Sequence, residues 1–157
     1  MTIPVVFRNH FQAGYVVRDL DKAMAQMGDT FGVAKWQVRR LSPGAPSRAL
    51  AFAYVQKLMI ELIELWPDQD TIYHGYIPEI DNAARLHHFG YLIDSEEQWH
   101  ETIAQFEAAG IRSALAGSSG DILDYYYADT VAALGHYCEL VRLKPGGKEF
   151  WAKVPHN

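Results

Sequence analysis

The sequence predicts an α+β fold built from two β-α-β-β-β modules. Residues 12–17 (Gln-Ala-Gly-Tyr-Val-Val) resemble residues 88–93 (His-Phe-Gly-Tyr-Leu-Ile), 76 positions later, and residues 59–63 resemble residues 137–141, 78 positions later. In each half, strand-like segments with alternating side chains accompany one amphipathic helical segment. Neither half can bury its sheet face alone, so the two duplicated units are expected to share one core.

The first half begins with a strand at about residues 11–17. Asp19 then offers a side-chain oxygen that caps a helix, and Gly32 ends this helix in a position that favours positive φ. The apolar stripe of the helix consists of Leu20, Ala23, Met24, Met27 and Phe31. Three strands are expected to follow at residues 36–41, 48–55 and 58–65, with a turn at 42–46.

The second half repeats this order, beginning with a strand at about residues 87–93. Ser95 and Gln98 form a capping-box pattern at the start of a helix that Gly110 ends. Its apolar stripe consists of Trp99, Ile103 and Phe106. Strands are expected near residues 111–115, 122–128 and 136–143, with a turn at 117–120.

Two segments fall outside the repeats. Residues 66–85 carry many turn residues and are expected to be a linker with a short helical or irregular piece. The C-terminal residues 144–157 are basic and aromatic, which is typical of a short helix or a strap. The prediction is therefore a single domain at 1–157, with the first repeat at about 10–65, the linker at 66–85, the second repeat at about 86–143 and the tail at 144–157.

Composition excludes several classes of function. Of the 157 residues, 49% are hydrophobic and 21% are charged, as in ordinary globular proteins, and the net charge of −5 argues against nucleic acid or an anionic membrane surface as a partner. No apolar run approaches the roughly 20 residues that a spanning helix needs, and residues 1–8 show no export signal. The single cysteine, Cys138, suits a reducing cytoplasm, and alternation predicts that it is buried and inert on the opposite sheet face from Glu139.

Four polar residues occupy equivalent positions in the two repeats: Gln12 and Glu61 in the first, His88 and Glu139 in the second. Alternation places Glu61 and Glu139 among apolar neighbours on inward faces, where an unpaired carboxylate costs several kcal/mol. A cation between the two carboxylates removes that cost, with an amide oxygen from Gln12 and a ring nitrogen from His88. This donor set suits a divalent ion such as Zn²⁺, Ni²⁺, Co²⁺, Mn²⁺ or Mg²⁺.

Each of these positions also has a simpler interpretation. A strand glutamine is commonly a hydrogen-bonding partner, and a strand glutamate is commonly solvated on an open sheet face. A histidine beside another histidine, as His88 is beside His87, is commonly structural. The symmetric placement of all four residues in two repeats favours the metal site.

These motifs resemble the vicinal oxygen chelate superfamily, which has the glyoxalase/bleomycin-resistance/dioxygenase fold. The similarity extends over residues 10–143 and depends on five segments, beginning at Gln12, Thr30, Ile60, His87 and Tyr137. It implies one barrel-like domain with a curved mixed sheet that encloses a metal and a small substrate. It also implies metal ligands at Gln12, Glu61, His88 and Glu139, with Glu139 as the leading catalytic base and Glu61 as the second candidate.

The ligand identities resemble those of zinc-type glyoxalase I enzymes. Methylmalonyl-CoA epimerase relatives have histidine where this chain has Gln12. Extradiol dioxygenases need two histidines and one carboxylate around iron, and Gln12 removes that set. His10 lies two residues earlier on the same strand face but outside the motif.

The resemblance implies a metal-dependent lyase, isomerase or epimerase that acts on a small oxygenated substrate through an enolate or enediolate. The glutathione-binding pattern does not map onto residues 62–67, so lactoylglutathione lyase activity is not favoured. The alternatives are a small-molecule binding protein of the bleomycin-resistance type, an interaction module and, less favoured, an extradiol-type dioxygenase. A homodimer in the cytoplasm is expected. Aromatic side chains near the expected pocket favour an aromatic or hydrophobic substrate, although they could equally pack the core; they are Trp66, Tyr73, Tyr76, Tyr125, Tyr126, Tyr127 and Tyr137.

Overall fold

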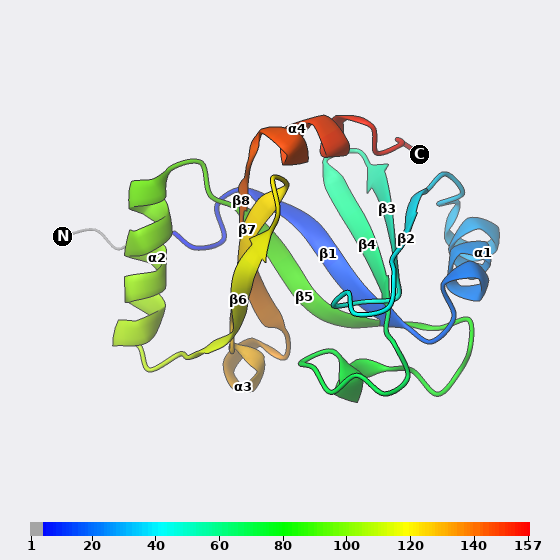
Figure 1. Ribbon diagram of the computed structural model, residues 1–157, viewed down its shortest axis with the longest axis horizontal. Coiled ribbons are helices and arrows are strands. Elements are labelled where there is room, and N and C mark those ends of the chain that lie inside the picture. The colour runs from blue at the N-terminus through cyan, green and yellow to red at the C-terminus, as the bar shows by residue number, and fades with distance from the viewer. Residues whose placement is uncertain (1–4) are drawn as a thin grey trace. The chain divides into compact units, whose positions relative to one another are not determined.

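The computed structural model describes residues 5–157, so the first four residues of the predicted domain lie outside it. The elements of the first half, labelled in Figure 1, are β1 (His10–Val17), α1 (Leu20–Phe31), β2 (Gln37–Arg40), β3 (Ala49–Val55) and β4 (Leu58–Glu64). Those of the second half are β5 (Ala84–Leu92), α2 (Glu96–Ala108), β6 (Ser113–Ser119), β7 (Leu123–Ala128) and β8 (Tyr137–Leu143). Three short helices complete the elements of residues 5–157: η1 (His74–Tyr76), α3 (Val131–Leu134) and α4 (Pro145–Ala152).

The strands have the order β2-β3-β4-β1-β5-β8-β7-β6 in a mixed sheet. Within each half, the first and last strands are parallel and the remaining pairs are antiparallel. The predicted α+β class with two β-α-β-β-β modules is confirmed.

The residues group into two compact units. The first unit contains Gln12–His87 together with Lys153–Asn157, and the second contains the described residues up to Phe11 together with His88–Ala152. The units therefore differ from the predicted repeats at their ends, because each takes a short terminal segment of the chain. That the chain is a single domain stays a prediction.

In the first unit, the sequence signals around α1 act as expected. The Asp19 side chain accepts a hydrogen bond from the Lys22 backbone N–H at 3.0 Å, and Gly32 ends the helix with a φ of 76°. Figure 1 shows α1 beside the strands of its own unit. The core between this helix and the sheet consists of Val17, Leu20, Ala23, Ala49, Ala51 and Leu62, with Trp36 and Ile60 packed against it.

In the second unit, α2 covers its sheet in the same way. Ser95 accepts a hydrogen bond from the Gln98 backbone N–H at 3.1 Å, as the capping signal predicts. The core consists of Tyr91, Ile93, Phe106, Tyr126, Ala128, Cys138 and Leu140. Cys138 is buried on this face, and burial raises the pKa of its thiol, which confirms the predicted buried cysteine.

One predicted turn is wrong. Residues 117–119 continue β6, and the turn begins at Gly120, which has a φ of 50°. Gly117 pairs with Tyr125, and a Cβ at Gly117 would lie 2.7 Å from the Tyr125 hydroxyl oxygen. The glycine at 117 therefore makes room for a tyrosine ring and does not bend the chain.

The segments outside the repeats are partly ordered into regular structure. The predicted linker contains η1, and β5 begins inside it at Ala84. The predicted tail contains α4, and its last residues bond to β3, with the Tyr54 N–H donating to the Pro155 carbonyl at 2.8 Å. None of the helices formed by residues 5–157 combines the length and apolarity needed to span a membrane.

Candidate metal centre

The second unit places His88 and Glu139 side by side. His88 lies on β5 and Glu139 on the parallel strand β8, where Glu139 pairs with Gly90. His88 Nε2 lies 3.2 Å from Glu139 Oε2. The His88 side chain is fully buried and that of Glu139 is 9% exposed, so the sheet holds an imidazole and a carboxylate together out of water.

Tyr127 contacts this pair from the antiparallel strand β7. It is directly opposite Glu139 in the β7–β8 register. Its ring stands edge-to-face on the His88 ring, with 5.1 Å between centroids and 85° between planes. Tyr127 is itself buried. The tyrosine therefore restricts the His88 ring while forming one wall beside Glu139.

The first unit holds Gln12 in an equivalent position. Gln12 lies on β1, is 3% exposed, and pairs with Met59 on the parallel strand β4. Its amide nitrogen donates to Met59 Sδ at 3.4 Å. With the nitrogen committed to sulfur, the oxygen is the atom of Gln12 that suits a cation.

Glu61 lies on β4 in the same unit, two residues after Met59. It pairs with Gly14 on β1 and with Phe52 on β3. This arrangement repeats that of Glu139, which pairs with Gly90 and Tyr127. Unlike Glu139, Glu61 is half-buried.

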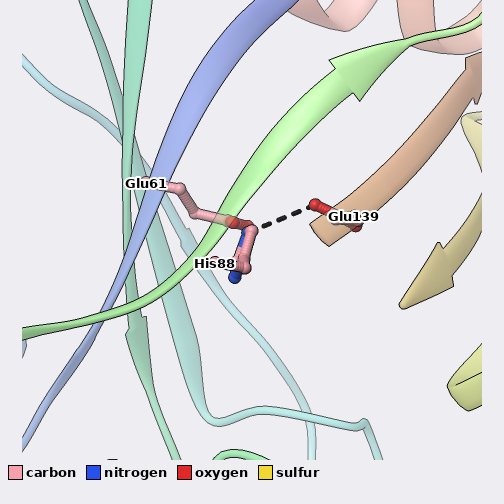
Figure 2. Close-up of side chains that lie close together, drawn as sticks. All are labelled: Glu61, His88 and Glu139. Atoms are coloured by element: carbon pink, nitrogen blue, oxygen red, sulfur yellow. Dashed lines mark ion pairs between the residues drawn. The ribbon is translucent and has the colours of Figure 1, made fainter. Parts of the chain in front are cut away.

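Three of the four predicted ligands form a group that could hold a metal ion. Glu61, His88 and Glu139 each offer one ligand atom, and these atoms all lie within 4.8 Å of one another (Figure 2). This group comprises histidine and carboxylate ligands, whereas Gln12 offers an amide oxygen.

The residues fit a divalent cation of the hard-to-borderline kind. Two carboxylates and one imidazole are ligands that Zn²⁺, Ni²⁺, Co²⁺ and Mn²⁺ accept, and a site with three protein ligands leaves positions for water or substrate. Burial of Glu139 also favours a cation, because a carboxylate removed from water is stabilised by positive charge.

Other residues considered from the sequence lie elsewhere. His10 is exposed, and its ring lies against Phe89 and Tyr91, which alternate with His88 and face the other side of β5. His87 is fully buried, with Nε2 3.2 Å from the Ile72 carbonyl oxygen. These contacts place His87 beside the segment that precedes β5.

The predicted aromatic residues divide among different surroundings. Tyr126 belongs to the core beneath α2, not to the His88 face. Tyr73 and Tyr76 lie against His87, at ring-centroid distances of 4.5 and 4.7 Å. Tyr127 contacts His88, and Tyr125 lies 6.1 Å from Tyr127. Tyr137 on β8 is directly opposite His88, so it lies on the His88 face as well.

The sequence pattern did not identify Phe52 as a residue on the same sheet face as Glu61. It is buried and opposite Glu61, at the position that Tyr127 holds opposite Glu139. The signal that could have identified it is the cross-strand register of β3 and β4, because directly opposed residues share one face of a sheet.

Comparison with known proteins gives a family match and several structural neighbours. A sequence profile described as Glyoxalase/Bleomycin resistance protein/Dioxygenase superfamily matches residues 11–127. No curated protein matches the chain.

The solved structures that resemble the chain show the same fold at low identity. Methylmalonyl-CoA epimerase from Mycobacterium tuberculosis is 16% identical with a TM-score of 0.65, covering 90% of this chain and 91% of that chain. A Streptomyces coelicolor methylmalonyl-CoA epimerase variant in complex with 2-nitronate-propionyl-CoA is 15% identical with a TM-score of 0.63, covering 87% and 97%. A hypothetical protein from Bacillus halodurans is 13% identical with a TM-score of 0.63, covering 86% and 94%.

Proposed function

The chain belongs to the glyoxalase/bleomycin resistance protein/dioxygenase superfamily, and we propose that it is a metal-dependent isomerase, epimerase or lyase of the glyoxalase type. Its substrate is a small organic molecule with two neighbouring oxygens. The observation that carries this proposal is the grouping of Glu61, His88 and Glu139, whose ligand atoms lie within 4.8 Å of one another. Two neighbours of the fold are named as epimerases, which supports the same class of chemistry.

We assign the metal ligands to Gln12, Glu61, His88 and Glu139. His88 contributes neutral imidazole nitrogen, Gln12 contributes amide oxygen, and the two glutamates contribute negative charge. When bound, a divalent cation supplies Lewis-acid stabilisation for the negative charge of an enolate or enediolate.

Glu139 is the proposed catalytic base. A carboxylate has two oxygens, so it can hold a cation with one and accept a proton with the other. Glu139 takes the proton from the carbon next to the substrate carbonyl, and the C–H electron pair becomes the C=C bond of the enolate. Delivery of a proton to the opposite face of that carbon by a second donor gives epimerisation, and return of the proton by Glu139 to the neighbouring carbon gives isomerisation.

Burial supports Glu139 over Glu61 in this role. Glu139 is 7% exposed and lies against His88 and Tyr127, whereas Glu61 is half-buried. A carboxylate shielded from water does not share its oxygens with competing solvent, which suits proton transfer with the substrate. Glu61 is the second candidate for proton transfer.

Metal content and hydrogen exchange together test this function. Protein purified without chelator is expected to carry about one divalent ion per chain, measured by mass spectrometry of the elements. The metal-loaded protein is then incubated in D₂O with 2-hydroxy ketones, 2-hydroxy aldehydes and 2-substituted malonyl thioesters, and deuterium incorporation is followed by NMR. Exchange that stops after chelation and returns with Zn²⁺, Ni²⁺, Co²⁺ or Mn²⁺ supports the proposal.

Two outcomes count against it. Metal-free protein that still binds an aromatic ligand tightly indicates a sequestering protein of the bleomycin-resistance type. Metal-loaded protein that consumes O₂ with a catechol indicates extradiol cleavage. The homodimer and the cytoplasmic location stay predictions, and sedimentation equilibrium at micromolar concentration tests the dimer.

A further inference from the structure

Gln37 carries a buried acceptor that the protein does not use. Its Oε1 is closed to water and has no hydrogen-bond partner among the described residues. A buried polar atom left without a partner costs on the order of 1–3 kcal/mol, so most such atoms in folded proteins are satisfied. The oxygen of Gln37 is therefore an acceptor that a bound partner could satisfy.

The register of the first unit places Gln37 on the Glu61 face of the sheet. Gln37 on β2 is opposite Phe52 on β3, and Phe52 is opposite Glu61 on β4. Directly opposed residues point to the same side of a sheet. The neighbouring residue Trp36 packs against the core beneath α1, on the opposite side, which agrees with this orientation.

The three side chains form a row across the strands. Neighbouring strands lie about 4.8 Å apart, so Gln37 is roughly 10 Å from Glu61 along this row, with Phe52 between them. Phe52 presents an apolar ring, and its neighbours on either side present polar groups. Gln37 as a whole is half-buried, so part of its side chain is exposed.

We propose that Gln37 is a specificity residue that accepts a hydrogen bond from the end of the substrate remote from the metal. This inference rests on the proposed function, because the metal fixes the other end. The substrate then has two neighbouring oxygens at one end, a flat or apolar middle over Phe52, and a hydroxyl or amide N–H roughly 10 Å away. Such a site rejects analogues that lack the donor, since the oxygen would again be buried and unpaired.

Hydroxamates test this inference because their two neighbouring oxygens chelate a divalent ion. Binding of benzohydroxamate, 4-hydroxybenzohydroxamate and 4-methoxybenzohydroxamate to the Zn²⁺-loaded protein is measured by calorimetry. The 4-hydroxy compound is expected to bind about tenfold more tightly than the 4-methoxy compound, the effect of one good hydrogen bond. 4-(Hydroxymethyl)benzohydroxamate extends the donor by one carbon and tests the span.

Two variants of Gln37 separate the hydrogen bond from packing. Gln37→Met keeps the length of the side chain without the acceptor, and the preference for the hydroxyl compound is expected to disappear. Gln37→Glu keeps an acceptor oxygen, and the preference is expected to remain. Gln105→Met is the matched control, since Gln105 on α2 has another buried oxygen without a partner and lies in the second unit.

The outcomes distinguish this inference from the proposed function. A preference that is absent in the wild type, or that persists in Gln37→Met, overturns the role of Gln37 while the metal site stands. Absence of binding by every hydroxamate, with or without Zn²⁺, overturns the proposed metal-dependent function and the role of Gln37 with it. Loss of the preference in Gln37→Met but not in Gln105→Met supports the assignment.

Discussion

The two units repeat one scaffold but differ in their chemistry. In the first unit, Glu61 is opposite Gly14 and Phe52. In the second, Glu139 is opposite Gly90 and Tyr127. The backbone register is therefore the same, and the differences lie in the side chains placed on it.

Those differences assign separate tasks to the two units. The first unit has an uncharged amide, Gln12, whose nitrogen is bonded to Met59 Sδ. The second has an imidazole, His88, beside a carboxylate at 3.2 Å, and both are more deeply buried than Glu61. The two equivalent positions therefore hold an amide with a carboxylate in the first unit and an imidazole with a carboxylate in the second. We infer that residues of the second unit carry out proton transfer and that residues of the first unit mainly bind the metal and position the substrate.

The largest expected effect tests this assignment through the two glutamates. Glu139→Gln keeps an oxygen ligand but cannot accept a proton, so the exchange rate should fall by about 10³-fold, within the range for loss of a general base. Glu61→Gln makes the same change in the first unit and should lower the rate by only about tenfold, since it removes charge from the site without removing the base. Deuterium incorporation by the metal-loaded variants measures both.

Metal content is the control for this comparison. Both variants should retain about one ion per chain. A larger loss of rate in Glu61→Gln than in Glu139→Gln, with metal retained in both, would assign the base to the first unit and reverse the comparison.

The next effect concerns the paired ligands His88 and Gln12. His88→Ala removes the imidazole and leaves Glu139 buried without it, so Zn²⁺ affinity should fall by more than about 100-fold. Gln12→Ala removes one neutral oxygen and should cost about tenfold, because a carbonyl oxygen is a weaker ligand for zinc than imidazole. Competition with a chromogenic chelator gives both constants, and equal losses would show that the two positions are equivalent ligands.

A smaller effect is expected from the residues opposite the glutamates. Tyr127→Leu removes the ring that stands on His88 at 5.1 Å and should weaken Zn²⁺ binding by about tenfold, as for other residues that orient a ligand. Tyr127→Phe keeps the ring and should remain within about twofold of the wild type. Phe52→Leu makes the corresponding change in the first unit. The visible spectrum of the Co²⁺-loaded protein should change in Tyr127→Leu and not in Phe52→Leu, and the reverse result would remove the role assigned to Tyr127.

Much of this comparison could be predicted from the sequence because strands alternate with a period of two. Alignment of residues 12–17 with 88–93 predicts that Gln12 and His88 lie on the same face of equivalent strands. The similarity of residues 59–63 to 137–141 places Glu61 and Glu139 at equivalent positions in the same way. The helix ends at Asp19 and Gly32 could also be predicted, because capping is a local interaction.

Features that depend on contacts distant in sequence could not be predicted. Glycine at position 117 is typical of a turn, yet Gly117 lies within β6. The Tyr125 ring occupies the space that a Cβ at position 117 would fill. The Thr130 side chain stands at the start of helix α3 but does not cap it, because its hydroxyl donates to the His136 carbonyl oxygen and accepts no hydrogen bond from the helix. The role of Gln37 depends on the register of β2 against β3, which no local pattern reveals.

The smallest effect concerns the ion pairs that stabilise the sheet of each unit. In the second unit, Asp124 on β7 accepts hydrogen bonds from Ser118 and Arg142 and lies 3.1 Å from Lys144 Nζ. The pKa of Asp124 is lowered to about 2, mainly by the hydrogen bond from Ser118 and also by Arg142 and Lys144. Burial has the opposite, smaller effect on this pKa. In the first unit, the carboxylate is on the last strand instead, where Glu64 lies 3.4 Å from Arg48.

The lowered pKa makes a prediction about stability at acid pH. Asp124 is protonated more easily in the unfolded chain than in the folded protein, so its contribution is complete above about pH 5 and is lost as the pH falls toward 2. Asp124→Asn should therefore lower the free energy of unfolding by on the order of 1 kcal/mol at pH 7 and by almost nothing at pH 2. For a chain of this size that corresponds to roughly 2–4 °C in Tm at neutral pH. Asp81→Asn is the control, because Asp81 forms an exposed ion pair with Lys22, and it should have a smaller effect. If the free energy of unfolding of Asp124→Asn differed from that of the wild type by the same amount from pH 7 to pH 2, packing and not the charge of Asp124 would stabilise this edge of the second unit.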